Sequence, residues 1–188
     1  GREKAESEWK NLHIRNQEMA EKDLKPYREA ITSLIRQTSM KVLICPEDMT
    51  QIKLGKKFVY DRLPKDVLKR VVWKSEYWLT DEALSTYLRS AGLFGLEQHS
   101  PIMCIGNGIP ALLGRFREQT TKGFMWKDIG LSDWYFDSDS KFDMDRLTAA
   151  VLELANDPQG CIERAKKAQD YVNSLNQKCV GHVRRNIT

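Results

Sequence analysis

Residues 93–114 read LFGLEQHSPIMCIGNGIPALLG, and this stretch decides the fold. A short apolar run over 93–96 ends in polar residues, a helix is predicted to begin at Ser100-Pro101, and glycines lead into a second apolar run over 111–114. The pattern indicates strand, loop, helix and strand. Parallel α/β sheets carry their ligand-binding groups where strands end and helices begin. The stretch therefore joins His99 to a helix start that favours anions, which suits a phosphorylated ligand.

Apolar runs alternate with helical patterns on both sides of this stretch. The predicted strands are 40–46, 71–73, 93–96, 111–114 and 134–136. The predicted helices are 24–36, 50–61, one from 80 stopped by Gly92, 100–105, one ending at 128, 143–155, and a long polar one from 159 onward. The first run is apolar throughout, which is typical of a buried parallel strand. The alternation predicts an α/β fold, with a Rossmann-like parallel sheet of about five strands flanked by helices.

The domain organisation follows from charge and length. Residues 1–22 are highly charged, so we expect a polar lead-in or interdomain linker, extended or helical. Residues 23–188 then form a Rossmann-like domain that ends in the long C-terminal helix. Pro26 would lie in the first turn of the helix over 24–36.

Composition argues against several classes of protein. The net charge of +4 is spread along the chain, so no nucleic-acid surface is expected. No apolar run reaches the ~18 residues of a membrane-spanning helix, and the first residues lack the apolar stretch of a signal peptide. The four cysteines lie far apart and lack metal-ligand spacing, which argues against a zinc site and leads us to expect a reducing cytoplasm. The GxGxxG fingerprint of dinucleotide binding is also absent after the first strand.

His99 is the leading catalytic candidate because it lies between the end of a predicted strand and the start of a predicted helix. An imidazole can exchange a proton near neutral pH. The alternative is a histidine that only hydrogen-bonds a loop carbonyl. Ser100 is a candidate helix cap with Pro101 at the first helical position, either beside a bound anion or as a plain cap.

A second candidate anion site lies in the run Gln119-Thr120-Thr121-Lys122. It gathers two hydroxyls, an ammonium group and an expected helix start within four residues. Arg115 and Arg117, just upstream, could clamp a carboxylate or a phosphate. The alternative is an ordinary capped helix with a solvated lysine.

Charged residues also follow other predicted strands. Glu47 and Glu97 could act as a base toward a sugar hydroxyl or hold it by hydrogen bonds, although Glu97 could instead pair with an arginine such as Arg115. Lys74 follows the second strand and is a further candidate ligand group.

Taken together, these residues resemble the polysaccharide pyruvyl transferase family. That family carries a histidine at a strand-to-helix turn, then a small-residue helix and a Gly-x-Pro entry to the next strand. The matching residues here are His99-Ser100-Pro101-Ile102, Gly108-Ile109-Pro110, Lys122-Gly123-Phe124 and Asp128-Ile129-Gly130-Leu131. The family often has an arginine where this chain has Glu97, so Arg15, Arg89 or Arg115 would have to supply that charge, or the donor differs.

The resemblance implies one half of a GT-B-like, two-domain transferase whose active site lies between its domains. The chain is about half the family's length, so we expect the C-terminal domain, with the N-terminal partner domain absent and the chain alone an incomplete enzyme. The implied activity, in exopolysaccharide biosynthesis, transfers a pyruvyl group from phosphoenolpyruvate to a sugar hydroxyl as a ketal. The implied partners are phosphoenolpyruvate or another phosphorylated donor and a saccharide acceptor. No metal or further cofactor is required.

This chemistry needs a general acid, cations for the carboxylate and phosphate, and a group that contacts the acceptor. We expect His99 to be the acid. The predicted site is His99 and Glu97 as catalytic residues, with Ser100, Arg115, Thr120, Thr121, Lys122, Glu47 and Lys74 binding substrate.

Two other functions fit the same sequence. One is a GT-B glycosyltransferase domain that uses a nucleotide sugar, which would need a carboxylate for the ribose after the Gly-x-Pro region. Glu118 is poorly placed for that because it follows the strand by several residues. The other is a non-catalytic, carbohydrate-related binding domain, which the loss of the family arginine at Glu97 favours.

Overall fold

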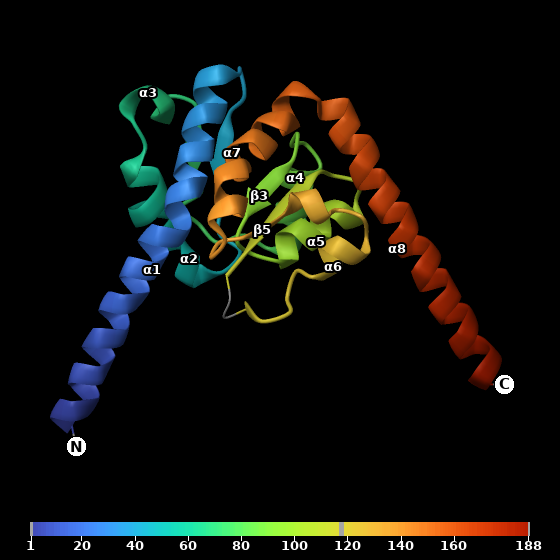
Figure 1. Ribbon diagram of the computed structural model, residues 1–188, viewed down its shortest axis with the longest axis horizontal. Helices are drawn as coiled ribbons and strands as arrows, with labels where there is room; N and C mark the ends of the chain where they lie inside the picture. The colour runs from blue at the N-terminus through green and yellow to red at the C-terminus, as the bar shows by residue number, and fades with distance from the viewer. Residues whose placement is uncertain (1, 117–118, 188) are drawn as a thin grey trace. The chain divides into compact units, whose positions relative to one another are not determined.

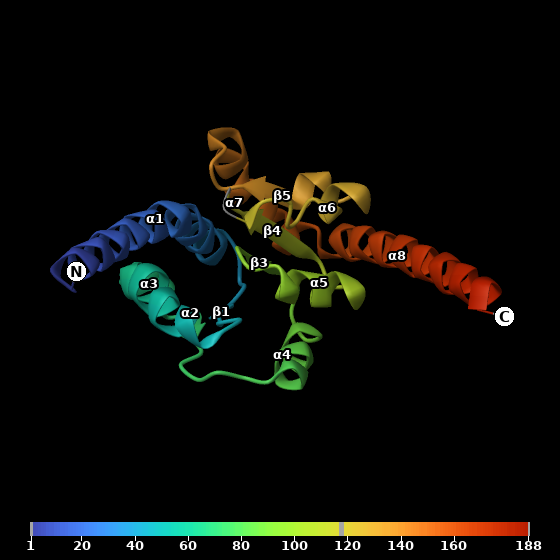
Figure 2. The same cartoon turned by 90° about the horizontal axis from the view of Figure 1, so that it is seen from below.

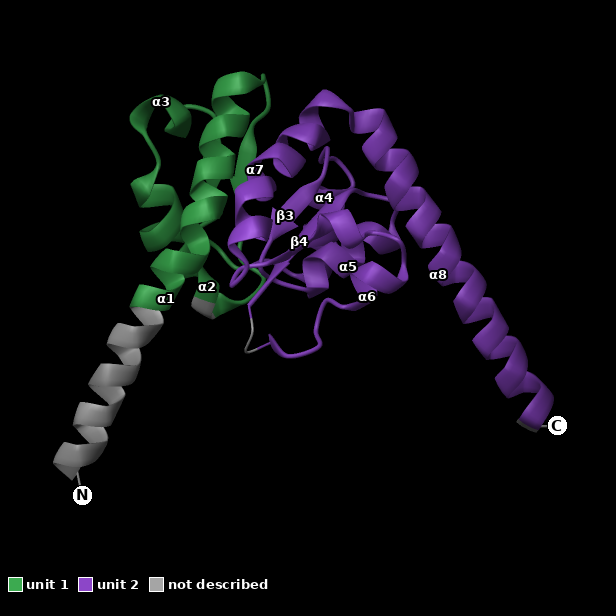
Figure 3. Cartoon of the chain, viewed as in Figure 1, with its two compact units in different colours: residues 1–77 green, residues 78–188 purple. Residues whose placement is uncertain are grey.

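The computed structural model describes residues 2–116 and 119–187, and the side chains among these except 2–17, 50 and 187. Arg117, Glu118 and the side chain of Arg15 therefore lie outside the described residues. The chain divides into two compact units, residues 1–77 and 78–188 (Figure 3). This division falls after the second strand, whereas the sequence placed a boundary at residue 22. The predicted extents of the linker and the domain stay predictions.

The first unit packs short elements against one long helix (Figure 1). Its elements are α1 (Arg2–Gln37), β1 (Val42–Ile44), α2 (Met49–Leu54), the π-helical η1 (Gly55–Val59), the 3₁₀-helical η2 (Tyr60–Arg62), α3 (Lys65–Leu68) and β2 (Val71–Trp73). In α1 the side chains of Tyr27, Ile31, Leu34 and Ile35 recur at helical spacing and are buried, and α1 contacts η1 and α3. The strands β1 and β2 pair in parallel, with Val42 opposite Val71.

Residues 2–22 are helical, which is one of the two forms expected for the lead-in, but they belong to the same helix as residues 24–37, so the predicted helix start near residue 24 was wrong. Pro26 lies inside α1, where its missing N–H removes one backbone hydrogen bond. Side chains join the turns before and after it. The Arg28 guanidinium donates to both Glu21 carboxylate oxygens, at 2.6 and 3.0 Å, and to the Phe58 carbonyl at 2.6 Å. Glu21 also pairs with Arg62, so this cluster ties α1 to η1 and η2.

The second unit is built on three parallel strands. Its elements are α4 (Thr80–Tyr87), β3 (Leu93–Gly95), α5 (His99–Gly106), β4 (Ala111–Arg115), α6 (Met125–Asp128), the 3₁₀-helical η4 (Ser132–Trp134), β5 (Tyr135–Asp137), α7 (Lys141–Asn156) and α8 (Pro158–Ile187). The central strand is β4, between β3 and β5 (Figure 2). Gly95 lies opposite Leu113, and Arg115 lies opposite Asp137.

The core of the second unit surrounds β4, which is buried along its whole length. The helix α5 packs on β3 and β4, and α7 packs on β5. The Trp126 indole is buried and donates a hydrogen bond to the Ala111 carbonyl at 3.2 Å. The first turns of α8 contact α5 and α7, and burial, helped by nearby carboxylates, raises the pKa of the Cys161 thiol to about 11.

The predicted α/β class and its parallel strands are confirmed, but their pairing differs from the prediction. The strands of the described chain form two sheets, of two and three strands, rather than one sheet of about five. Alternation along the sequence predicts which strands exist, while pairing depends on which edges meet in space. Across the described residues, every helix is too short or too polar to cross a membrane.

The Glu21 cluster predicts a pH-dependent stability. The hydrogen bond from Arg28 holds the pKa of the Glu21 carboxyl below its usual value, against the opposing effect of burial, and the charges of Arg28, Arg62 and Lys25 add to it. A carboxyl group whose pKa is lowered in the folded state stabilises the fold at pH values above its unfolded-state pKa, which is near 4. That stabilisation is lost as the pH falls through the folded-state pKa. We expect Glu21→Gln to lower the free energy of unfolding at pH 7 by up to about 1 kcal/mol, and by much less at pH 3.

Urea unfolding followed by circular dichroism at both pH values measures this difference. Glu29→Gln is the matched control, since Glu29 lies on the same helix and makes only an exposed 3.9 Å ion pair with Lys25. Equal losses for the two variants at pH 7 would show that the cluster does not stabilise the unit.

Candidate functional site

The carboxyl ends of β3, β4 and β5 meet at one edge of the second sheet. Arg115 ends β4, and Asp137, the residue opposite it, ends β5. Gln119 joins the segments that leave β3 and β4. Its side-chain amide donates to the Leu96 carbonyl at 3.2 Å, and its oxygen accepts from the Phe116 N–H at 3.2 Å. The residues that follow β3, including Glu97 and His99, therefore lie on the same edge as Arg115.

Arg115 is the most constrained charged side chain of this edge, with 7% of its surface exposed. Its guanidinium donates to the Tyr135 hydroxyl at 3.1 Å and, more weakly, to the Phe116 carbonyl at 3.4 Å. The guanidinium carbon lies 5.0 Å from the centre of the Phe124 ring, within cation–π range. These contacts fix the orientation of a planar donor fork, the geometry that binds carboxylate or phosphate by two bonds.

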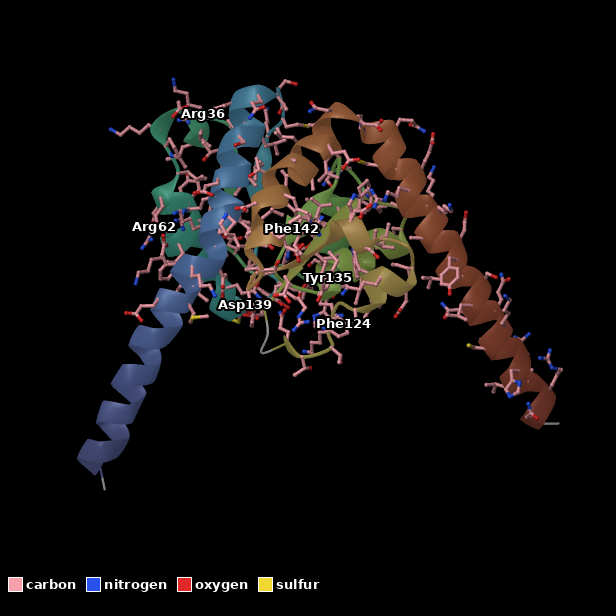
Figure 4. All side chains as sticks on the ribbon, in the orientation of Figure 1. Arg36, Arg62, Phe124, Tyr135, Asp139 and Phe142 are labelled. Carbon is pink, nitrogen blue, oxygen red and sulfur yellow. The ribbon has the colours of Figure 1, made fainter. Side chains whose placement is uncertain are left out.

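A cavity of about 380 Å³ opens beside Arg115. Its lining combines three cations, two carboxylates, three hydroxyls and two aromatic rings, from Arg115, Phe124, Lys127, Ser132, Tyr135, Asp137, Ser140, Asp143 and Arg146. Two of these residues, Phe124 and Tyr135, are labelled in Figure 4. Their rings are arranged edge to face, with their centres 6.1 Å apart. The volume is within the range of small-molecule sites.

The cations of the cavity differ in their roles. Arg146 pairs with Asp143 at 3.0 Å and donates to the carbonyls of Asp133 and Tyr135. The second oxygen of Asp143 accepts from the Asp137 N–H at 2.9 Å, so this pair holds the start of α7 against β5. Arg146 is therefore structural.

Lys127 is the cation best able to assist Arg115. Its ammonium is exposed and lies 4.9 Å from the centre of the Tyr135 ring and 5.2 Å from that of Phe124. The Phe124 ring is thus shared by the guanidinium and the ammonium. Arg115 and Lys127 both line the cavity.

The start of α5 differs from the sequence prediction. The helix begins at His99, which is exposed, with Gln98 at the N-cap position and no capping hydrogen bond from its side chain. Ser100 is not the cap. It is buried, and its hydroxyl accepts a hydrogen bond from the Tyr87 hydroxyl at 3.0 Å. Its side chain therefore joins α4 to α5, and Pro101 is the third helical residue rather than the first.

The run from Thr120 to Lys122 does not start a helix. These residues form turns with exposed side chains, and α6 begins only at Met125 and has four residues. Thr120 has a φ of 56°, so the backbone reverses where a helical start was expected. The predicted anion site at a helix start is absent from these residues, although they follow Gln119 on the candidate edge.

Glu47 and Lys74 belong to the first unit and form a separate group. They follow the adjacent strands β1 and β2, and the Lys74 N–H donates to the Ile44 carbonyl at 2.9 Å. The first unit also has a hollow of about 330 Å³ lined in part by Arg28 and Arg62. Both arginines already bind Glu21, so that hollow is the weaker candidate for an anion.

Several cavity residues were missed at the sequence level. Asp137 ends a strand, so the rule that selected Glu97 could have found it. Lys127 and Phe124 gave no such signal, because they reach the cavity only after the chain reverses at Gly123. Among the described side chains, no cluster of three or more His, Cys, Asp or Glu could hold a metal ion.

Comparisons with protein-family models, curated proteins and solved structures found no match. The function is therefore argued from the site itself.

The chain reversal beside the cavity gives a testable prediction. Gly123 has a φ of +88°, and a Cβ there would lie 2.9 Å from a Leu113 methyl carbon and 3.2 Å from the Tyr135 ring. Gly130 has a φ of +78°, and a Cβ there would meet nothing within 4 Å. Alanine costs about 1–2 kcal/mol at either position through backbone strain. At Gly123, the clash should add about 1–3 kcal/mol more.

Urea unfolding of Gly123→Ala and Gly130→Ala compares the two losses directly. Equal losses would mean that Gly123 does not make room for Leu113 and Tyr135.

Proposed function

We propose that this chain is the donor-side domain of a polysaccharide pyruvyl transferase, which transfers a pyruvyl group from phosphoenolpyruvate to a sugar hydroxyl as a ketal. One observation carries the proposal. Buried Arg115 ends the central strand beside a cavity that also holds Lys127, on the sheet edge that carries His99. This arrangement supports binding of a small anion at the sheet edge that also carries the proposed proton donor.

Phosphoenolpyruvate suits these cations because its C2 carbon carries both a carboxylate and a phosphate ester. In this proposal, the Arg115 fork binds one of the two groups through two parallel hydrogen bonds. Lys127 binds the other as a point charge. The partly enclosed cavity strengthens both interactions relative to open water.

The reaction then needs one proton at the methylene carbon of phosphoenolpyruvate. His99 is the proposed acid, and protonation makes C2 electrophilic. A sugar hydroxyl bonds to C2 and loses its proton, and the bond between C2 and the phosphate oxygen breaks to release phosphate. A second hydroxyl of the same sugar then closes the ketal. Glu97, at the exit of β3, is the proposed group that contacts the acceptor.

The rest of the proposal comes from the resemblance to the polysaccharide pyruvyl transferase family. It includes a GT-B-like N-terminal partner domain, a saccharide acceptor from exopolysaccharide biosynthesis and a cytoplasmic location. In the complete enzyme, Glu47 and Lys74 would act as further substrate contacts.

Ligand-induced shifts of the melting temperature test the donor site, with phosphoenolpyruvate, inorganic phosphate and UDP as ligands. A ligand at 100 times its Kd adds about 2.7 kcal/mol of stability. We expect phosphoenolpyruvate to stabilise the chain and Arg115→Gln to weaken its binding roughly 10- to 100-fold, the value of a charge-assisted hydrogen bond. His99→Gln should leave binding intact, because His99 is proposed to transfer a proton.

Arg89→Gln is the matched control, since Arg89 is exposed and donates to the Ser85 carbonyl within α4 and the turn that follows. Arg115→Lys keeps the positive charge but lacks the planar guanidinium fork. It therefore tests the binding geometry even if Arg115→Gln fails to fold. Stabilisation by UDP alone would favour a glycosyltransferase domain. The absence of any phosphoenolpyruvate effect would contradict a donor site on this chain.

A further inference from the structure

The helix α8 continues beyond the part of the second unit on which it packs (Figure 3). In its first turns, Cys161, Ala165 and Ala168 are almost fully buried. The Gln169 side chain then donates to the Gly106 carbonyl at 2.6 Å. Beyond this bond the helix is largely exposed. Its large apolar side chains there are about half exposed, with Tyr171 at 52%, Leu175 at 48%, Val180 at 51% and Val183 at 52%.

The apolar stripe of the buried first turns of α8 continues into the exposed part of the helix after Gln169. Ala168, Val172, Leu175, Cys179 and Val183 follow one another at spacings of three and four, which places them on one face of a helix. The face that packs against α5 and α7 in the first turns is therefore presented to solvent later on. A short solvated helix that contains Gly181 and several valines is only marginally stable alone, so a partner surface would stabilise it.

The charge of this half identifies the kind of partner. Residues 171–187 include Lys178, Arg184 and Arg185 but no aspartate or glutamate, and the last acidic residue of the chain is Asp170. By helical spacing these cations lie outside the apolar stripe, and their long side chains can extend to either side of it. A helix with an apolar stripe and a polar face whose charged groups are all lysine or arginine matches the interface of an anionic membrane.

We propose that residues 171–187, the cationic helix end, bind the surface of an anionic membrane. The helix lies along the bilayer plane, its apolar stripe enters the boundary between headgroups and acyl chains, and its cations contact lipid phosphates. A second copy of the chain fits less well. The exposed stripe is shorter than the three or four heptads of a typical coiled coil. In a dimer, the cations of one copy would also find no acidic residues in the same segment of the other copy to pair with. This inference does not depend on the proposed enzymatic function.

Co-sedimentation with lipid vesicles tests the proposal, comparing pure phosphatidylcholine with phosphatidylcholine mixed with phosphatidylglycerol. We expect the chain to bind the mixed vesicles more tightly and to lose that binding as salt is raised. The double variant Arg184→Gln and Arg185→Gln should bind the mixed vesicles roughly 10- to 30-fold more weakly. The double variant Leu175→Asn and Val183→Asn should also lose binding, because it interrupts the stripe.

Lys166→Gln with Lys167→Gln is the matched control, since it removes the same charge from exposed positions of α8 that precede the cationic helix end. All the substituted side chains are exposed, and circular dichroism verifies that each variant is folded. Equal binding to both kinds of vesicle, or binding to neither, would overturn the proposal. So would a concentration-dependent dimer that the Leu175 and Val183 replacements abolish, which would assign the stripe to a second copy.

Discussion

The complete burial of β4 is the constraint on which the second unit depends. A parallel strand paired on both edges and covered by helices must be apolar along its length, and Ala111, Leu112 and Leu113 are at most 1% exposed. A polar residue can then appear only where the strand ends. Arg115 occupies that end, and the exits of β3 and β5 are brought beside it by the register of the sheet. The candidate site is thus a consequence of how the core is packed.

Arg115 combines a structural role with a proposed chemical one. Burying a guanidinium is costly unless its donors are satisfied, and here a hydroxyl, a carbonyl and an aromatic ring surround it. Arg146 has a structural role, because it pairs with Asp143 and its donors hold the backbone. The place of Arg115 at the end of β4, in the lining of the cavity, is the reason for proposing it as the binding group.

The sequence predicted the elements better than their assembly. The strand over 71–73 was located correctly, and β3, β4 and β5 were each placed within one residue, because short apolar runs bounded by turns are local signals. The start of α1 was missed because the helix continues through charged residues and Pro26, which resemble a linker and a first turn. The short helix α3 was missed altogether. Pairing into two sheets could not be predicted, since it depends on contacts between distant edges.

The site was predictable to the same extent. His99 was placed correctly after the third strand, and Arg115 was selected as a cation just before the run over 119–122; the structure puts both on one sheet edge, and their roles stay predictions. Ser100 was misread because its role depends on Tyr87, which lies on another helix. Thr120, Thr121 and Lys122 were read as a helix start, whereas the backbone turns at Thr120 and reverses at Gly123. That reversal brings Phe124 and Lys127 to the cavity, and we found no local sequence pattern that predicts it.

The most direct test of the central claim is a nuclear magnetic resonance titration with phosphoenolpyruvate, observing the arginine Nε–H signals and the backbone amides together. The Arg115 signal can be assigned by its loss in Arg115→Lys. We predict that it shifts on titration, together with the amides of Phe116 and Gln119 at the exit of β4. Shifts confined to Arg28 and Arg62 in the first unit, with Arg115 unmoved, would contradict the claim that the carboxyl edge of β4 binds the anion.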